Sequence, residues 1–293
     1  MLRELGPDPR HNYVLTTGWG RTPPRLALLK PMDPMFSAGD AYERFMGRWS
    51  RRLAPLFVRF AGIPPDATVL DVGCGTGALT EAVLFEGRAG PVIAIDASAP
   101  YVAFARKRFP GRRARFQVGD AQQLPLPLNA VDTTLSLLIL NLIPDRDRAV
   151  REMLRVTRPG GSLAAAVWDY GQGMQMLRIL WDEAVAVDAA ADQSDERHMP
   201  LCREGELHLL WRASGLQDVE EQVLSIDTPF SSFDDYWLPF LEGQGPAGAY
   251  VAALPSGHRE QLERRLRQRL LGNGPDGPIL LRACAWAVRG VVP

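Results

Sequence analysis

A cluster of glycines with a nearby carboxylate is the strongest chemical signal in the chain. The segment Val69-Leu-Asp-Val-Gly-Cys-Gly-Thr-Gly77 places Asp71 just before glycines at 73, 75 and 77. Glycines let the backbone turn sharply after a strand and approach a ligand closely. A helix that begins at Ala78 would point free N–H groups and the positive end of its dipole at the same place. The segment therefore predicts a loop that binds an anionic group of a ligand.

Two further carboxylates follow predicted strands. Asp96 ends the apolar run Val92-Ile-Ala-Ile-Asp96, and Asp120 stands in the segment Val118-Gly-Asp-Ala121. A carboxylate at the end of the second strand can accept both hydroxyls of a ribose. A carboxylate beside Ala121 is suited to the amino group of an adenine. The three acidic positions together predict a nucleoside-containing ligand that lies across the strand ends.

Two ligands fit this arrangement. Gly73, Gly75 and Ala78 satisfy the pattern G-x-G-x-x-G/A, and Asp96 lies at about the ~20-residue offset expected in a dinucleotide site. The other ligand is S-adenosylmethionine, which has an ammonium, a sulfonium, a ribose and an adenine. A buried Asp71 would repel a pyrophosphate but suits a nearby cation. Asp71 therefore favours S-adenosylmethionine over NAD.

The elements that position these residues alternate between strands and helices. Strands are expected at 68–71, 92–96, 115–118, 131–140 and 162–168, with a turn at 158–161. Helices are expected at 40–61, 78–85, 99–109 and 145–156. This alternation predicts a doubly wound, mostly parallel α/β sheet. Later segments are expected as helices at 171–190, 203–213 and 258–271, the last an amphipathic surface helix, and as strands at 219–227 and 277–288.

Composition excludes several classes of protein. The chain has 293 residues, 46% of them hydrophobic, with 33 basic against 34 acidic residues, a net charge of -1. This near balance disfavours nucleic acid as the main partner. The three cysteines lack metal-ligand spacing, so no metal site is expected. The most apolar stretch, 135–143, is shorter than the ~20 residues that cross a bilayer, so we expect a cytoplasmic protein without membrane insertion.

The domain organisation follows from the same patterns. Residues 1–39 are rich in proline and lack apolar periodicity, so a loose extension is expected there, with Met35 as a candidate alternative start. Residues 40–293 are expected to form a single domain. Its cofactor half covers 40–170, and insertions on the acceptor side cover about 170–200 and 229–275.

The chain resembles the class I S-adenosylmethionine-dependent methyltransferases, in the branch of the ubiquinone and menaquinone C-methyltransferases. The motifs are Val69–Gly77, the acidic strand end at Asp96, Gly119-Asp-Ala121, and Leu154-Arg-Val-Thr-Arg-Pro-Gly-Gly161. Tyr42-Glu-Arg-Phe-Met-Gly-Arg-Trp49 resembles the helix that covers the cofactor in that branch. The resemblance implies a seven-stranded, Rossmann-like sheet whose last strand is antiparallel.

The same resemblance implies roles for individual residues. Asp71 and the three glycines would line the methionine end, and Asp96, Ala97 and Ser98 would hold the ribose. Asp120 and Ala121 would flank the adenine, and Leu137 would lie over the methyl-bearing sulfur. Tyr42 and Arg48 would contact the cofactor from the covering helix. The implied reaction moves a methyl group to a small or medium-sized organic acceptor by in-line displacement.

The acceptor side is less constrained by the sequence. Asn141-Leu-Ile-Pro144 lacks the second proline and the aromatic residue that methyltransferases acting on base amines have after strand four. No cysteine lies between Cys74 and Cys202 that could serve as a nucleophile on cytosine. Ligands of open α/β sheets bind at the carboxyl ends of strands, which makes Asn141, Trp168, Asp169 and Tyr170 the candidates for acceptor contact. An NAD-dependent oxidoreductase and a non-catalytic cofactor-binding regulator stay open as alternatives.

Overall fold

The computed structural model describes residues 39–86, 89–111 and 113–293, and the statements below concern these residues. The expected extension over 1–39, including Met35, lies outside them except for Gly39, which begins the first helix.

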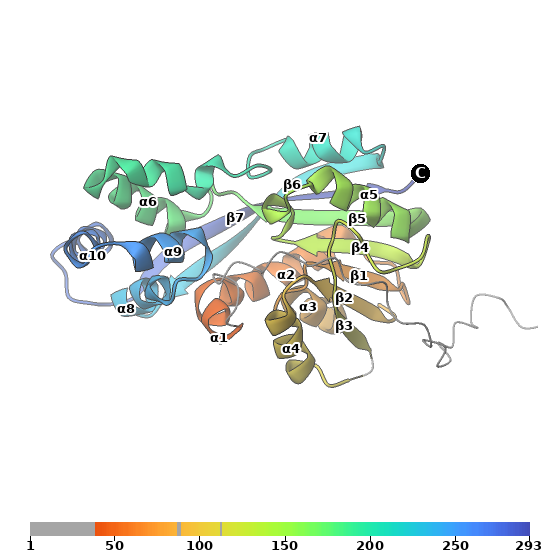
Figure 1. The fold of residues 1–293 in the computed structure, drawn as a ribbon, viewed down its shortest axis with the longest axis horizontal. Helices are drawn as coiled ribbons and strands as arrows, with labels where there is room; N and C mark the ends of the chain where they lie inside the picture. The colour runs from red at the N-terminus through yellow and green to blue at the C-terminus, as the bar shows by residue number, and fades with distance from the viewer. Residues whose placement is uncertain (1–38, 87–88, 112) are drawn as a thin grey trace, which may run out of the picture. The chain divides into compact units, whose positions relative to one another are not determined.

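A sheet of seven strands forms the centre of this described part, in the order β3-β2-β1-β4-β5-β7-β6 (Figure 1). The strands are β1 (Val69–Val72), β2 (Val92–Asp96), β3 (Ala114–Val118), β4 (Val131–Leu137), β5 (Thr157–Trp168), β6 (Gln217–Phe230) and β7 (Ile279–Val291). Neighbours among β1 to β5 pair in parallel, whereas β7 is antiparallel to both β5 and β6. The expected doubly wound sheet with an antiparallel last strand is confirmed.

The order of the strands reverses between β1 and β4. β2 and β3 lie on one side of β1, and β4 and β5 lie on the other. Ligands of open α/β sheets bind outside the carboxyl ends of strands at such a reversal. The loops after β1, β2 and β4 therefore meet at the expected ligand-binding edge.

Helices cover both faces of the sheet (Figure 1). One face is covered by α2 (Arg48–Ala61), α3 (Ala78–Glu86) and α4 (Ala99–Arg108), and the other by α5 (Arg146–Val156) and α7 (Glu206–Ala213). Buried residues form one apolar cluster on each face, around Phe57 and Val83 on the first and around Met153 and Trp211 on the second. Burial on both faces explains why β2 and residues 163–168 of β5 are almost entirely apolar.

The two expected insertions are helical. The first contains α6 (Gln175–Val187) and the 3₁₀ segments η4 (Ala189–Ser194) and η5 (Glu196–His198). The second contains α8 (Phe233–Trp237), η6 (Leu238–Glu242), α9 (Gly245–Ala253) and α10 (Ser256–Leu271). In α10, Leu262 and Leu266 are fully buried while Arg265 and Arg269 form ion pairs with Glu183, so the amphipathic surface helix is confirmed.

Several boundaries differ from the expectation. The helix expected over 40–61 is three consecutive segments, α1 (Gly39–Tyr42), a π-helical η2 (Glu43–Gly47) and α2. The fourth strand ends at Leu137 rather than 140, because Leu138 has a φ of 65° and a 3₁₀ segment, η3 (Leu140–Leu142), follows. Residues 158–161, expected as a turn, are counted within β5, but Gly160 has a φ of 72° and the pairing of β5 with β4 passes directly from Thr157 to Ser162.

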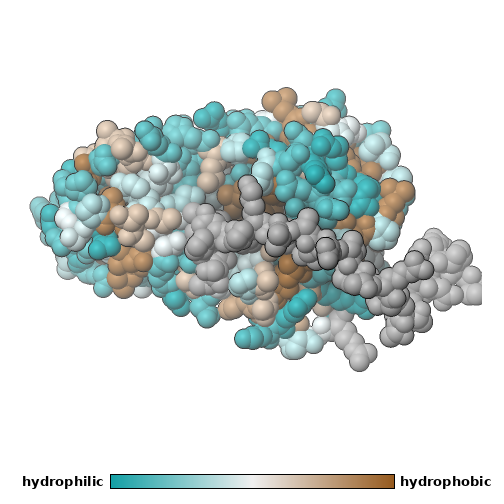
Figure 2. Space-filling model, viewed as in Figure 1, coloured by the Kyte–Doolittle hydropathy of each residue, from teal (hydrophilic) through white to brown (hydrophobic). Residues whose placement is uncertain are grey.

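Hydrophilic and hydrophobic residues are interspersed on the face shown in Figure 2. Among the described residues, no helix is both long and apolar enough to span a membrane.

Candidate functional site

The glycine loop joins β1 to α3 and is tied to β2. The backbone N–H groups of Gly73 and Cys74 both donate to the Ile95 carbonyl, at 2.7 and 3.1 Å. Gly73 and Gly77 have φ values of 75° and 93°, which residues other than glycine rarely adopt. A Cβ on Gly73 would lie 2.6 Å from the Ile139 side chain. Ile139, after β4, therefore packs directly on the loop, a contact that no motif in the sequence indicated.

Gly75 is different from its neighbours in the loop. Its φ is 52°, yet no atom lies within 4 Å of the position that a Cβ would take. Its backbone N–H donates to Asp96 Oδ2 at 2.8 Å. The structure thus leaves open space beside a fixed backbone amide, between the ends of β1 and β2, as a ligand cradle requires.

An alanine at position 75 is expected to weaken ligand binding strongly while it lowers the stability of the fold only a little. Gly75→Ala should cost about 1 kcal/mol of folding free energy for the left-handed backbone. Because its methyl group would occupy the open cradle, affinity for S-adenosylhomocysteine should fall about tenfold. Gly205→Ala is the matched control, since Gly205 also has a positive φ (82°) and no atom within 4 Å. Calorimetry showing equal affinities for the two variants would contradict this role of Gly75.

Asp71 is a buried carboxyl with unused hydrogen-bonding capacity. Its exposed fraction is 0%, and its Oδ2 accepts a hydrogen bond from the Thr80 hydroxyl at 2.7 Å. Its Oδ1 is also buried and has no hydrogen-bond partner among the described residues. Burial, with a smaller contribution from the charge of Asp96, raises the pKa of Asp71 to about 7. A cationic group of a ligand would satisfy this oxygen and favour the ionised form.

Asp96 is held rigidly at the end of β2. Oδ1 accepts from the Ser98 backbone N–H at 2.7 Å, and Oδ2 accepts from Gly75. Each carboxylate oxygen keeps a further lone pair, so both can still accept a ligand hydroxyl. Burial raises the pKa of Asp96, and the two backbone hydrogen bonds oppose that rise. The side chain of Ser98 caps α4, whereas Ala97 is exposed.

Asp120 lies in a turn after β3. Its Oδ1 accepts from the backbone N–H of Gln122 at 2.8 Å and from the amide side chain of the same residue at 3.1 Å. Asp120 and Ala121 are both half-buried. The turn fixes the direction of this carboxylate, and its expected contact with an adenine stays a prediction.

The two residues expected to contact the cofactor from the covering helix, Tyr42 and Arg48, have different neighbours. Tyr42 packs against α4, where its ring centroid lies 5.5 Å from that of Tyr101. Burial raises the pKa of the Tyr42 phenol, and the charge of Asp96 adds to that rise. Arg48 instead donates to Asp235 Oδ1 at 2.6 Å and lies over the rings of Trp49 and Phe230. Arg48 therefore links α2 to the second insertion rather than to the glycine loop.

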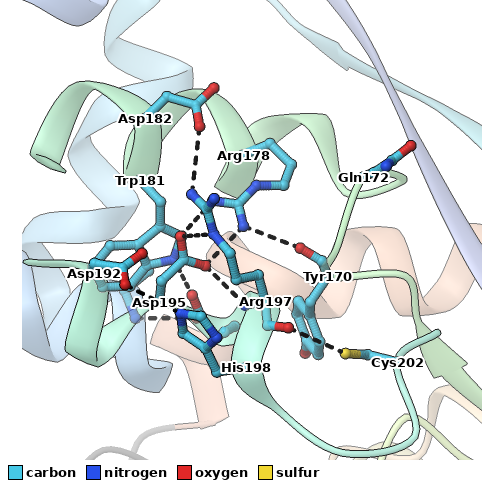
Figure 3. Close-up of polar contacts among 12 residues, drawn as sticks. Tyr170, Gln172, Arg178, Trp181, Asp182, Asp192, Asp195, Arg197, His198 and Cys202 are labelled. Atoms are coloured by element: carbon cyan, nitrogen blue, oxygen red, sulfur yellow. Dashed lines mark hydrogen bonds and ion pairs between the residues drawn. The ribbon is translucent and has the colours of Figure 1, made fainter. Parts of the chain in front are cut away.

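Asn141 in η3 and Tyr170 after β5, two of the residues expected near the acceptor, lie beside the first insertion. Asn141 is 7% exposed, its Nδ2 donates to Met199 Sδ at 3.3 Å, and its buried Oδ1 has no partner among the described residues. Burial raises the pKa of Tyr170, the charge of Glu196 raises it further, and the Asn141 amide opposes the rise. Figure 3 shows Tyr170 between Arg178 and Cys202. Its phenol is therefore protonated at neutral pH and can donate a hydrogen bond.

The other three positions expected near the acceptor or the methyl group have structural contacts. Trp168 is 2% exposed and belongs to the core, and Leu137 is a buried residue at the end of β4. Asp169 accepts from the Gln172 backbone N–H at 2.9 Å and so stabilises the turn after β5.

Two consecutive carboxylates of the first insertion have opposite environments. Asp195 accepts from both terminal nitrogens of Arg178, at 2.7 and 2.6 Å, and from Arg197 Nε at 2.6 Å (Figure 3). Glu196 is 4% exposed, and its carboxylate accepts from two uncharged donors of the described residues, the Trp181 indole and the Ala247 backbone N–H. Burial raises the pKa of Glu196 to about 7. No motif in the sequence pointed to this group, because its burial depends on α6 and α9.

The buried Glu196 is expected to make stability depend on pH. A carboxyl whose folded-state pKa is raised stabilises the fold fully below its ordinary pKa and loses that contribution as pH rises through about 7. Glutamine cannot ionise, so Glu196→Gln does not lose this stabilisation as pH rises. The melting temperature of the variant minus that of wild type should therefore be about 2–4 °C larger at pH 8 than at pH 5. Scanning calorimetry measures it, with exposed Glu204→Gln as the control. A difference that does not change with pH would contradict the burial of an ionisable group here.

No group of three or more histidine, cysteine or acidic residues within the described part could hold a metal ion.

The glycine loop and the strands beside it lie in a segment that matches a known protein family. Residues 70–165 match the family model described as "Methyltransferase domain". The match covers β1 to β5, which includes the glycine loop and the two strand ends with Asp96 and Asp120. The resemblance expected from the motifs is thereby confirmed for this domain.

Proteins similar to the chain include two that are named as methyltransferases. It is 37% identical over 132 residues to malonyl-[acyl-carrier protein] O-methyltransferase of Pectobacterium atrosepticum, covering 44% of this chain and 49% of that one. It is 32% identical over 140 residues to a ubiquinone/menaquinone biosynthesis C-methyltransferase of Hahella chejuensis, covering 46% and 56%. The matches therefore span less than two thirds of either relative.

A solved structure agrees on the fold. Phosphoethanolamine N-methyltransferase 2 of Haemonchus contortus, in complex with S-adenosyl-L-methionine, is 19% identical with a TM-score of 0.54. The similarity covers 87% of this chain and 56% of that one.

Proposed function

We propose that this protein is an S-adenosylmethionine-dependent methyltransferase that acts on a small organic acceptor. The proposal rests mainly on buried Asp71, whose Oδ1 has no hydrogen-bond partner among the described residues. Asp71 lies beside the glycine loop, and the next strand ends in Asp96. A pyrophosphate would meet a carboxylate there, whereas an ammonium or sulfonium is attracted to it. This arrangement favours S-adenosylmethionine over NAD.

The residues present fit that cofactor. Asp71 would hold the ammonium group, the Gly75 amide region would adjoin the methionine end, and the two Asp96 oxygens would accept the ribose hydroxyls. Asp120 and Ala121 would flank the adenine, and Tyr42 would cover it from the side of the first helix. When bound, S-adenosylmethionine supplies a methyl group that is already activated for displacement. The protein then has to position an acceptor in line and exclude water.

The acceptor half favours an uncharged or cationic molecule. The Tyr170 phenol can donate a hydrogen bond, and Asn141 Oδ1 can accept one. Among the described charged groups nearby, Arg178 is paired with Asp195, and Glu196, whose pKa is about 7, carries a negative charge above neutral pH. A carboxylate acceptor would be repelled in such a site. We therefore infer that an alcohol, phenol, amine or carbon acid accepts the methyl group.

Calorimetry with S-adenosylmethionine and with NAD tests the cofactor assignment. We expect micromolar binding of S-adenosylmethionine and none of NAD, and binding of NAD alone would overturn the proposal. Formation of S-adenosylhomocysteine is then followed across phenols, amines and carboxylic acids, with the acids the poorest substrates. Cofactor binding without turnover of any compound would favour a non-catalytic regulator.

A further inference from the structure

Two of the residues proposed to bind the cofactor, Asp71 and Asp96, are almost closed off from solvent, as is Thr76 in the glycine loop. Asp71, Thr76 and Asp96 are 0%, 1% and 8% exposed. A ligand group that contacts these two carboxylates therefore has to displace the part of the protein that covers them. The segment Gly39–Gly47, which we call the covering segment, lies over this side of the site through Tyr42 and Glu43.

One residue fastens the covering segment to the glycine loop. The carboxylate of Glu43 accepts a hydrogen bond from the Thr76 hydroxyl through Oε1 and pairs with Arg51 through Oε2. Arg108 Nη1 lies 3.9 Å from the same Oε2. The side chain of Glu43 is only 12% exposed, so these charged contacts are largely shielded from water.

The local backbone is arranged around this carboxylate. The covering segment changes from α-helical to π-helical at Glu43, and π-helical turns are frequent at functional sites. A Cβ on Gly47 would lie 2.7 Å from Glu43 Oε1, so glycine at 47 leaves room for the side chain to cross toward the loop. Thr76 follows Gly75, whose amide holds Asp96. Glu43 is thus connected through the loop to a proposed cofactor ligand.

We propose that Glu43 is a positioning residue that latches the covering segment onto Thr76, and that opening this latch controls how fast the cofactor leaves. The inference rests on the proposed function, because it assumes that S-adenosylmethionine and S-adenosylhomocysteine occupy the loop. The helix that follows the covering segment in the chain, α2, is anchored in the core by Trp49, Leu53 and Phe57, which are 0–1% exposed. The motion is therefore confined to the covering segment, which swings away while α2 stays in place.

Rapid-mixing kinetics of S-adenosylhomocysteine binding to the full chain tests the latch. Thr76→Val removes the hydroxyl with little change in shape and leaves both arginine contacts of Glu43 in place. We expect the dissociation rate to rise about tenfold and the association rate to change less than about threefold. Thr76→Ser should keep the wild-type rates within about twofold because it restores the donor. Glu43→Gln should also speed dissociation, and the double variant should be no faster than the faster single variant.

The control removes a different contact of the same segment. Glu242→Gln breaks the exposed pair between Arg44 and Glu242, which faces the second insertion, and should leave both rates unchanged. If Thr76→Val dissociates at the wild-type rate, or loses affinity only through slower association, the latch is wrong. If the wild-type protein does not bind S-adenosylhomocysteine at all, the proposed function itself fails. The rates of Glu43→Gln are used only if its melting curve shows a folded protein. If it does not fold, Thr76→Val alone decides whether the latch exists.

Discussion

Asp96→Ala is expected to weaken S-adenosylmethionine binding about 100-fold, because two charge-assisted hydrogen bonds to ribose hydroxyls would be lost and each is worth roughly a factor of ten. The carboxylate is well placed for this task. Both oxygens are already oriented by backbone N–H groups, of Gly75 and Ser98, so little ordering is required when the ribose arrives. Isothermal titration calorimetry at pH 8 measures the affinity.

A companion variant separates the lost ribose contacts from damage to the loop. Alanine leaves the Gly75 and Ser98 N–H groups without their acceptor, whereas Asp96→Asn keeps one acceptor oxygen and nearly the same volume. We expect Asp96→Asn to retain the melting temperature within about 2 °C of wild type and still lose about tenfold in affinity. Exposed Asp147→Asn controls for the removal of one negative charge. Wild-type affinity in both Asp96 variants would refute the ribose assignment.

Asp71→Asn is expected to have opposite effects on binding and on stability. With the pKa of Asp71 at about 7, the ionised form that attracts an ammonium becomes dominant only above neutrality. Wild-type affinity for S-adenosylmethionine should therefore rise with pH up to about 7 and then level off. Asparagine cannot ionise, so the variant should bind at least about tenfold more weakly at pH 8 and approach wild type below pH 6.

The stability of the same variant should move the other way. The raised pKa means that Asp71 stabilises the fold fully below its ordinary pKa of 3.8 and that this contribution is lost as pH rises through about 7. Asparagine still accepts the Thr80 hydroxyl but carries no charge, so the variant should melt a few degrees higher than wild type at pH 8. At pH 4 the two proteins should melt alike. A variant that is less stable at pH 8 and binds normally would contradict the assignment of Asp71.

The sequence determined the cofactor half of this protein. Glycines after a short apolar strand, and carboxylates at the ends of the next two strands, are local features whose spacing the chain carries directly. Their structural consequences are local as well: Gly73 and Gly77 take positive φ values, and Asp96 binds amides within its own loop and the adjacent one. Because parallel strands end at one edge of a sheet, the order of the motifs was sufficient to bring them together.

Only the tertiary structure decided what surrounds these motifs. Arg48 and Asp235 are 187 positions apart, and Glu43 and Thr76 are 33 apart, so no periodicity or spacing relates them. Glu196 was unremarkable in the sequence, since a pKa near neutrality requires burial by α6 and α9, which contribute the Trp181 and Ala247 donors. Local spacing positions the glycine loop and the ends of β1 and β2, whereas burial and side-chain pairing depend on elements far away in the chain.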